Sequence, residues 1–176
     1  MSVRRKCAPF VCGVALTMLG LAGTAAVPST RAADVPSSDD QSQIKAIEDK
    51  LGQLVDPADV RRYYADDAVL FDALAPGLIK GAAAIEKSFA AQLRGVRSVN
   101  TTVLHEETVI SGSLAVVYSL QAIRVAMMDG TERRVVCRVS DIYRKQGAEW
   151  RIAHQHISYP IDPVSGQAQF ALTPQP

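Results

Sequence analysis

Apolar residues in the first half of the chain recur every three or four positions, which is the spacing of one helical face. In the first such segment they are Ile44, Ile47, Leu51 and Leu54. Ser38 precedes this segment and Gln41 follows three residues later, which is the pattern of a capping box. The sequence therefore predicts a helix that begins near Ser38 and packs one face against a core.

Two further helices and a short strand are predicted before residue 94. Asp56 and Pro57 suit the N-cap and the first position of a second helix, which we expect to reach residue 67. A short strand is predicted at residues 68–72, and the turn residues 75–77 end it. Gly81 then opens a third helix, whose apolar face holds Ala82, Ile85, Phe89 and Leu93.

From residue 99 onward the period changes to two, which is the alternation of β-strands. Strands are predicted at residues 99–110, 113–127, 132–145 and 150–161. Short Gly-containing turns join them, and the Asp129-Gly130 pair is a strong hairpin signal. Helices followed by an antiparallel meander indicate an α+β fold with the helices on one face of a curved sheet.

The lengths of the turns also predict the register of the sheet. Two-residue turns pair residue 110 with 113 and residue 128 with 131, and a three-residue turn pairs 145 with 149. Polar groups among apolar neighbours on a helix-covered face are typical of a pocket wall. A one-residue change in register would exchange the two faces. The predicted polar rows are Ser119–Ser140–His154 and Gln121–Arg138–His156, and Trp150 shares their face.

The opposite face of the predicted sheet is mostly apolar. A sheet that is apolar on both sides suggests a partner, and the simplest partner is a second copy of the chain. We therefore expect a homodimer that forms through the sheet. The apolar residues predicted on this face are Val99, Val103, Leu114, Val116, Leu120, Val135, Cys137, Val139, Ile157 and Tyr159.

Residues 1–32 have the order of a secretory signal peptide: a basic start at residues 4–6, an apolar run over residues 10–22, and small residues after it. The apolar run is shorter than the ~20 residues that span a bilayer, so no stable membrane anchor is predicted. We expect cleavage after Ala32 or near Ala26. The predicted product is a periplasmic or secreted protein with a linker at residues 33–39, one domain at 40–163 and a surface tail at 164–176.

Removal of the leader changes the charge and the cysteine count. The chain has 19 Lys and Arg against 18 Asp and Glu, and residues 1–32 hold four of the basic residues and no acid. The remaining 15 against 18 leave no basic patch, so nucleic acid is not an expected partner. Cys137 is the single remaining cysteine, which excludes an internal disulfide and is typical of a small core residue.

Asp72 and Arg138 are candidates for chemistry, and each has a structural alternative. Asp72 can act as a general base in a cavity, or it can pair with Arg138 or cap the turn that follows it. Arg138 can bind a ligand oxygen in a forked geometry, or its charge can be balanced by Asp72 or Glu106. In either case a buried guanidinium needs a partner.

His154 and His156 lie two residues apart on one strand and point to the same side. Either can be a general acid or a hydrogen-bond donor, or both can simply tie the strand to the polar rows. A metal site needs a further ligand, and His105 lies on the other predicted face, so we predict neither a metal nor a cofactor. The further predicted binding residues, for which core packing is an alternative at Tyr64 and Trp150, are Tyr64, Gln121, Ser140 and Trp150.

Four segments carry a resemblance to a known family. They are Tyr64-Ala-Asp-Asp-Ala-Val-Leu-Phe-Asp72, Gly81 with Ala84-Ile85 and Phe89, Arg138-Val-Ser-Asp-Ile-Tyr143, and Gly147-x-x-Trp150-Arg-Ile-x-His154-x-His156-x-Ser158. Together they resemble the SnoaL-like branch of the nuclear transport factor 2-like (NTF2-like) superfamily over residues 44–161. The resemblance implies a cone-shaped sheet wrapped over N-terminal helices, an internal cavity and, usually, a dimer through the sheet.

The family resemblance also suggests functions. Members include ketosteroid isomerases, polyketide cyclases, dehydratases, epoxide hydrolases and non-catalytic binders, and Asp72 matches the general base of the isomerases. The isomerase oxyanion-hole Tyr would fall near Glu48 and its partner acid near Ser140, so that pair does not carry over.

We therefore expect a small, largely apolar ligand in the cavity. Acid/base chemistry of an isomerase, cyclase or hydrolase type would use Asp72 as base and Arg138 or His156 as electrophilic partner. The alternative is a non-catalytic binding or dimeric assembly module in which the polar rows are structural.

Overall fold

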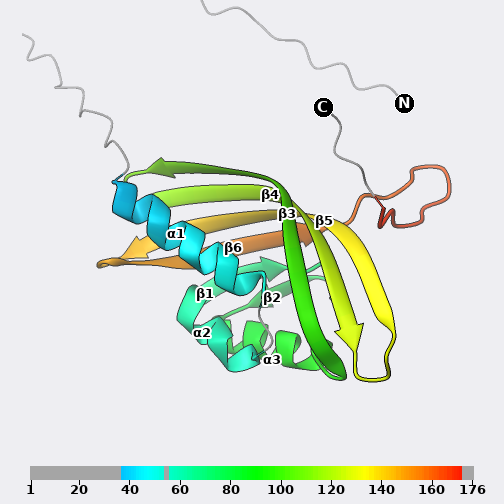
Figure 1. The fold of residues 1–176 in the computed structure, drawn as a ribbon. Coiled ribbons are helices and arrows are strands. Elements are labelled where there is room, and N and C mark those ends of the chain that lie inside the picture. The colour runs from blue at the N-terminus through cyan, green and yellow to red at the C-terminus, as the bar shows by residue number, and fades with distance from the viewer. Residues whose placement is uncertain (1–36, 54–55, 172–176) are drawn as a thin grey trace, which may run out of the picture. The chain divides into compact units, whose positions relative to one another are not determined.

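The structure of the protein, a computed structural model, describes residues 37–53 and 56–171 (Figure 1). The signal peptide, its cleavage sites and most of the linker fall outside these residues and stay predictions, as does Leu54 on the first helix. Within the described part of the chain, no helix combines the length and the apolar character needed to cross a membrane.

The first helix, α1 (Ser38–Leu51), is present as predicted, but its N-cap is Ser37 and not Ser38. The backbone N–H of Asp40 donates to the Ser37 hydroxyl at 3.1 Å. Residues four apart on a helix lie on one face, and the buried face of α1 carries Asp40, Ile44 and Glu48. Two carboxylates are thus buried beside one isoleucine, which the apolar spacing alone did not predict.

The second predicted helix is shorter than expected. Asp56 caps a short 3₁₀ turn, η1 (Pro57–Asp59), and α2 (Val60–Tyr63) follows it. The chain then enters β1 (Tyr64–Phe71), so the extension of the helix to residue 67 was wrong. Pairing of β1 with β6 (Glu149–Ser158), at the far end of the chain, explains the difference, because a tertiary contact overrides local helix preference.

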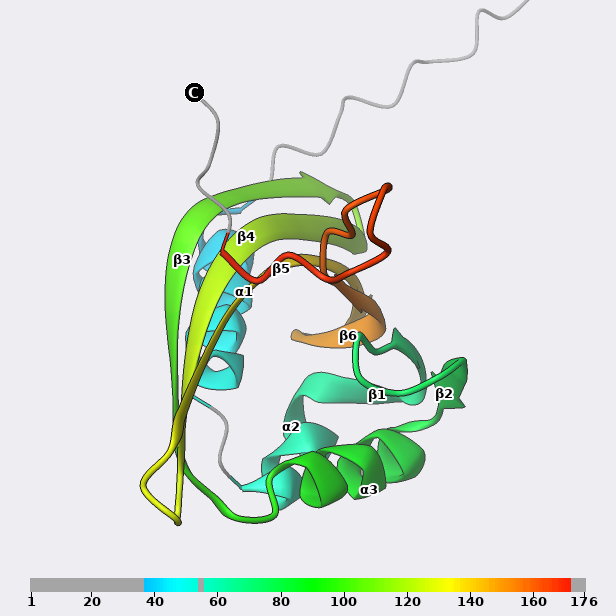
Figure 2. The same ribbon diagram turned by 90° about the vertical axis from the view of Figure 1, so that its right-hand side faces the viewer.

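The remaining elements follow the predicted order and build the α+β fold. β2 (Leu78–Lys80) pairs with β1, and Gly81 caps α3 (Ala82–Gln92). β3 (Val96–Ser111), β4 (Leu114–Met127) and β5 (Glu132–Gln146) form the antiparallel meander with β6. The strand order is β2-β1-β6-β5-β4-β3, and β1 runs parallel to β6. Figures 1 and 2 show the long strands curving around α1.

The turn between β4 and β5 differs from the prediction by one residue. The N–H of Met127 donates to the carbonyl of Thr131 at 2.9 Å, so the loop holds the three residues Met128, Asp129 and Gly130. Gly130 has φ 88°, the left-handed conformation expected at the third position of such a loop. Ala126 therefore pairs with Glu132, and every side chain of β5 faces the side opposite to the predicted one.

The one-residue shift of β5 also changes the face on which some side chains of β6 lie. Ser140 pairs with His156 and Ile142 with His154, so the predicted pairing of Ser140 with His154 was wrong, and these residues lie on the outer face of the sheet. An irregularity in β6 next to Ala153 restores Ile152 to the inner face, where it joins the core. The inner face of β5 instead carries Arg133, Val135, Cys137, Val139, Asp141 and Tyr143.

The core lies between the inner face of the sheet and the helices. Trp150 is 2% exposed, and its indole N–H donates to Asp40 Oδ1 at 2.8 Å. Lys145 reaches the same carboxylate oxygen at 2.5 Å. The hydrogen bond from Lys145, followed by that from Trp150, lowers the pKa of Asp40 to about 2. This buried polar contact joins the start of α1 to the β5–β6 hairpin.

The C-terminal segment turns back along the sheet. Past the end of β6, the N–H of Val136 in β5 donates to the carbonyl of Phe170 at 3.0 Å. The Phe170 ring packs edge-on against Tyr159, with 5.2 Å between the ring centroids. The tail therefore covers a stretch of the β5 edge that β6 leaves unpaired.

Candidate functional site

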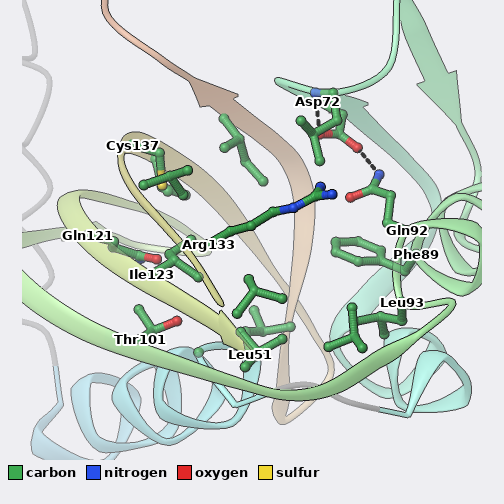
Figure 3. A pocket seen from close by; sticks show the side chains of 18 of the residues that line it. Leu51, Asp72, Phe89, Gln92, Leu93, Thr101, Gln121, Ile123, Arg133 and Cys137 are labelled. Atoms are coloured by element: carbon green, nitrogen blue, oxygen red, sulfur yellow. Dashed lines mark hydrogen bonds between the residues drawn. The ribbon is translucent and has the colours of Figure 1, made fainter. Parts of the chain in front are cut away.

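A cavity of about 650 Å³ lies on the inner face of the sheet (Figure 3). Leu51 at the end of α1 and Phe89 and Leu93 of the α3 region contribute apolar walls. A largely apolar cavity of this size with a few polar groups is typical of a small-molecule site. The sheet contributes Val96, Val99, Ile123, Val125, Met127, Val135, Val139 and Ile157.

Asp72 lines this cavity directly after the end of β1. Its Oδ1 accepts a hydrogen bond from the N–H of Leu74 at 3.0 Å, which caps the following turn. Its Oδ2 accepts a hydrogen bond from the Gln92 amide at the end of α3 (Figure 3). The turn cap that we considered as an alternative is therefore present, and it holds the carboxylate at the cavity wall.

A second polar group lies where α1 approaches the sheet. Asp141 of β5 is 1% exposed and lines the cavity, together with Tyr64, Gln155 and Glu48. The Tyr64 hydroxyl donates to Gln155 Oε1 at 2.5 Å, and the Tyr143 hydroxyl donates to Glu48 Oε1 at 2.7 Å. Within the described residues, Asp141 Oδ1 is buried without a hydrogen-bond partner.

Burial raises the pKa of Asp141 well above its ordinary value, and the charge of Glu48 raises it further. Burial also raises the pKa of Glu48, while a hydrogen bond from Tyr143 opposes that rise. Two carboxyl groups in contact cannot both ionise cheaply. The raised pKa favours the neutral form of Asp141, and the O–H of a neutral carboxyl can donate a hydrogen bond.

Three of the sequence-predicted site residues line the cavity: Asp72, Tyr64 and Gln121. Tyr64 is also buried in the core, where its hydroxyl donates to Gln155. The Gln121 amide donates to the Ser119 hydroxyl at 2.9 Å, so part of its hydrogen-bonding capacity is used within the sheet.

The predicted face was wrong for Arg138, Ser140, His154 and His156, which lie on the outer face because β5 is shifted by one residue. The two histidine rings instead pack edge-on against Phe71, with centroid distances of 5.4 and 5.9 Å. Their position gives no support to a role in the cavity. Trp150 is a core residue between the sheet and α1 and does not line the cavity.

The sequence analysis missed Asp141, Gln155, Glu48 and Arg133. The first two are sequence neighbours of the chosen residues Ser140 and His156, and the position of Gly130 in a three-residue loop was the available signal. Cys137 is buried in the cavity wall, and burial raises the pKa of its thiol to about 11. Residues 37–53 and 56–171 contain no group of three metal-ligating side chains.

Comparison with known proteins gives the family. Residues 49–162 match the family model of the SnoaL-like domain. The chain belongs to the SnoaL-like family. This assignment confirms the resemblance seen in the sequence, and the fold it implied is the one the structure shows. A comparison with curated proteins gives no match.

Several solved structures are also similar to this SnoaL-like chain. An NTF2-like protein of unknown function from Pseudomonas putida is 27% identical, with a TM-score of 0.67, and the match covers 78% of this chain and 99% of that one. A proposed dehydratase of the NTF2-like family from Streptomyces avermitilis is 12% identical, with a TM-score of 0.60 and coverage of 69% and 97%. A proposed calcium/calmodulin-dependent protein kinase II association domain from Xanthomonas campestris is 19% identical, with a TM-score of 0.58 and coverage of 67% and 83%. The last two similarities show the fold alone.

Proposed function

We propose that this SnoaL-like protein binds a small, largely apolar molecule in the cavity and performs acid/base chemistry on it. The observation that carries the proposal is the pair of carboxyl groups that line one apolar cavity in different environments. Asp72 accepts two hydrogen bonds, from Leu74 and Gln92, which fix its carboxyl group at the cavity wall. Asp141 is buried without a partner for Oδ1, which suits a neutral acid.

The two groups have complementary roles in the proposed chemistry. Asp72 takes a proton from carbon or from water, as the family resemblance implied for its position. Asp141 donates a hydrogen bond to the oxygen on which negative charge develops, and a buried donor of this kind stabilises an enolate more than water does. Isomerisation and dehydration both use this pair of steps, and one of the similar structures is described as a proposed dehydratase.

Replacing Asp72 by Asn tests the proposed base. We expect the variant to lose about 100-fold or more of the rate at which the protein exchanges the protons next to the carbonyl of 2-tetralone for deuterium, followed by NMR. The free energy of unfolding should change by less than about 1 kcal/mol, because an amide oxygen can still accept the bond from Leu74.

The matched control is Asp66→Asn, the same substitution at an exposed position of β1 outside the cavity lining. It should leave the exchange rate unchanged. Equal exchange rates in the wild-type protein and in Asp72→Asn would exclude Asp72 as the base. A lower melting temperature without a change in rate would assign Asp72 a structural role.

An assembly role is favoured by a separate observation on the outer face. Val109, Val116 and Ile142 form a row across β3, β4 and β5, and each side chain is at least 36% exposed. Exposed apolar patches of this kind mark interaction surfaces. We therefore propose that two copies of the chain associate through this face, as the sequence analysis expected.

Sedimentation velocity at about 10 µM, a concentration at which many specific dimers are populated, tests the proposed dimer. We expect the wild-type protein to sediment as a dimer. Val116→Glu should weaken the dimer by roughly 100-fold, because the interface would bury an unpaired charge. Val164→Glu places the same charge on the tail, where the side chain is 95% exposed, and should leave the dimer intact. A monomeric wild-type protein would refute the proposal.

A further inference from the structure

Arg133, at the start of β5, brings a positive charge into the cavity. Its register partner on β4 is Val125, and both residues line the cavity. Figure 3 shows the Arg133 side chain extending from β5 across the cavity, toward the side that carries Asp72 and Gln92. Arg133 is exposed, so its side chain meets both solvent and the cavity. Its place in the cavity lining was not predicted from the sequence, because an Arg beside a hairpin turn usually lies in solvent alone.

The Arg133 guanidinium has no partner among residues 37–53 and 56–171. No ion pair and no hydrogen bond of these residues includes it. Asp72, on the side toward which Arg133 points, already accepts hydrogen bonds at both of its carboxylate oxygens. The guanidinium therefore presents its N–H donors to whatever occupies the cavity.

The neighbouring residue Arg134, in contrast, has an acidic partner. It pairs in register with Arg124 of β4 on the outer face, and its guanidinium lies 3.5 Å from the carboxylate of Glu132. Both arginines contribute to the lining of the cavity, but Arg134 has an acidic partner in Glu132, whereas Arg133 forms no ion pair among the described residues and feels the charge of Asp129 only at longer range.

The charges around the cavity also determine where an anionic group can bind. Asp141 and Glu48 are acidic groups at the α1 side, so a second negative charge is disfavoured there. Near Arg133 a planar guanidinium among apolar side chains can hold a carboxylate or sulfonate with two parallel hydrogen bonds. An amphipathic ligand would therefore bind in one orientation.

We propose that the ligand of this cavity is an apolar organic anion, whose anionic group is bound by Arg133 and whose apolar body extends toward Asp141. This inference rests on the proposed function, because it names the ligand class of the same cavity. An oxygen on the body of the ligand can then accept the hydrogen bond from Asp141. The anionic group gives the ligand its orientation, and the apolar walls contribute the contact area.

Two fluorescent probes with one aromatic body test the proposal. Anilinonaphthalene sulfonate and N-phenyl-1-naphthylamine differ only by the sulfonate, and both become brighter in apolar sites. We expect the anionic probe to bind the wild-type protein about tenfold or more tightly than the neutral one, because a charged hydrogen-bonding pair has this effect. Decanoate should displace the anionic probe from the protein, whereas decanol at the same concentration should not.

Arg133→Gln should remove the preference for the anionic probe and leave binding of the neutral probe unchanged. Arg124→Gln is the matched control, since it removes an exposed positive charge on the neighbouring strand β4, outside the cavity lining, and it should keep the preference. Val116→Glu should also keep it, which excludes binding of the probes to the exposed apolar row of the outer face.

The outcomes separate this inference from the proposed function. If both probes bind equally well and Arg133→Gln changes neither, the anion inference is overturned while binding in the cavity stands. If neither probe binds, both are overturned. If Arg133→Gln does not fold, a salt titration of the wild-type protein replaces it. The preference for the anionic probe should fall when the salt concentration rises from about 20 to 500 mM, because salt screens a solvent-accessible charge. A preference that stays constant overturns the inference.

Discussion

Replacing Trp150 by Ala is expected to lower the free energy of unfolding by about 3–5 kcal/mol. The Trp150 ring is 2% exposed and belongs to the main core cluster, so its removal leaves a cavity between the sheet and α1. The variant also loses the indole donor to Asp40, which is the contact that joins α1 to the β5–β6 hairpin. Urea denaturation followed by circular dichroism measures the effect, since the only Trp of the chain is removed.

Trp150→Phe separates the two contributions. It keeps most of the apolar volume but cannot donate to Asp40, and we expect a loss of about 1–2 kcal/mol. Lys145 can still hold the Asp40 carboxylate in this variant. A loss below about 1 kcal/mol for Trp150→Ala would show that α1 does not depend on Trp150 for its position.

At pH 8, Asp141→Asn is expected to be more stable than the wild-type protein, and the advantage should disappear near pH 4. The pKa of Asp141 is raised well above its ordinary value of 3.8 in the folded protein. Between these two pKa values the folded state binds more protons than the unfolded state, so wild-type stability falls as the pH rises. The slope from one such group is about 1.4 kcal/mol for each pH unit. The amide side chain of the variant does not titrate, so this decline is absent.

Urea denaturation of both proteins at several pH values from about 4 to 8 measures the difference over the range in which an acid with a raised pKa loses its proton. Asp67→Asn is a control for which stability should change with pH in the opposite direction, because a hydrogen bond from Arg144 lowers the pKa of Asp67. Its contribution to stability is present above the unfolded pKa and is lost as the pH falls. Stability curves that run parallel for the wild-type protein and Asp141→Asn would show that Asp141 is ionised in the folded state.

Much of the fold follows from local patterns in the sequence. The period of four in α1, the Asp-Pro start of the second helix and the Gly81 cap each have a local physical cause. The four long strands were located because alternation and turn residues are also local signals. The parallel pairing of β1 with β6 joins residues about ninety positions apart, and no local signal specifies it.

The site was harder to predict than the fold because it depends on one residue in one loop. With two residues in the β4–β5 turn, Arg138 and Ser140 would face the cavity, whereas the observed three-residue loop turns Asp141 inward. Asp72 does not depend on this turn, and its placement in the cavity was predicted. Arg133 and Glu48 carry charges, and apolar periodicity does not indicate charged residues that face a cavity.

The two carboxyl groups of the cavity belong to separately supported parts of the structure. Asp72 and its partner Gln92 are carried by the β1–β2–α3 segment, whereas Asp141 and Arg133 are both carried by β5. A small rigid-body displacement of the first segment would alter the length of molecule that fits between the groups without disturbing the buried acid. The position of α3 can therefore change the length of ligand that fits, while the buried acid on β5 keeps its place.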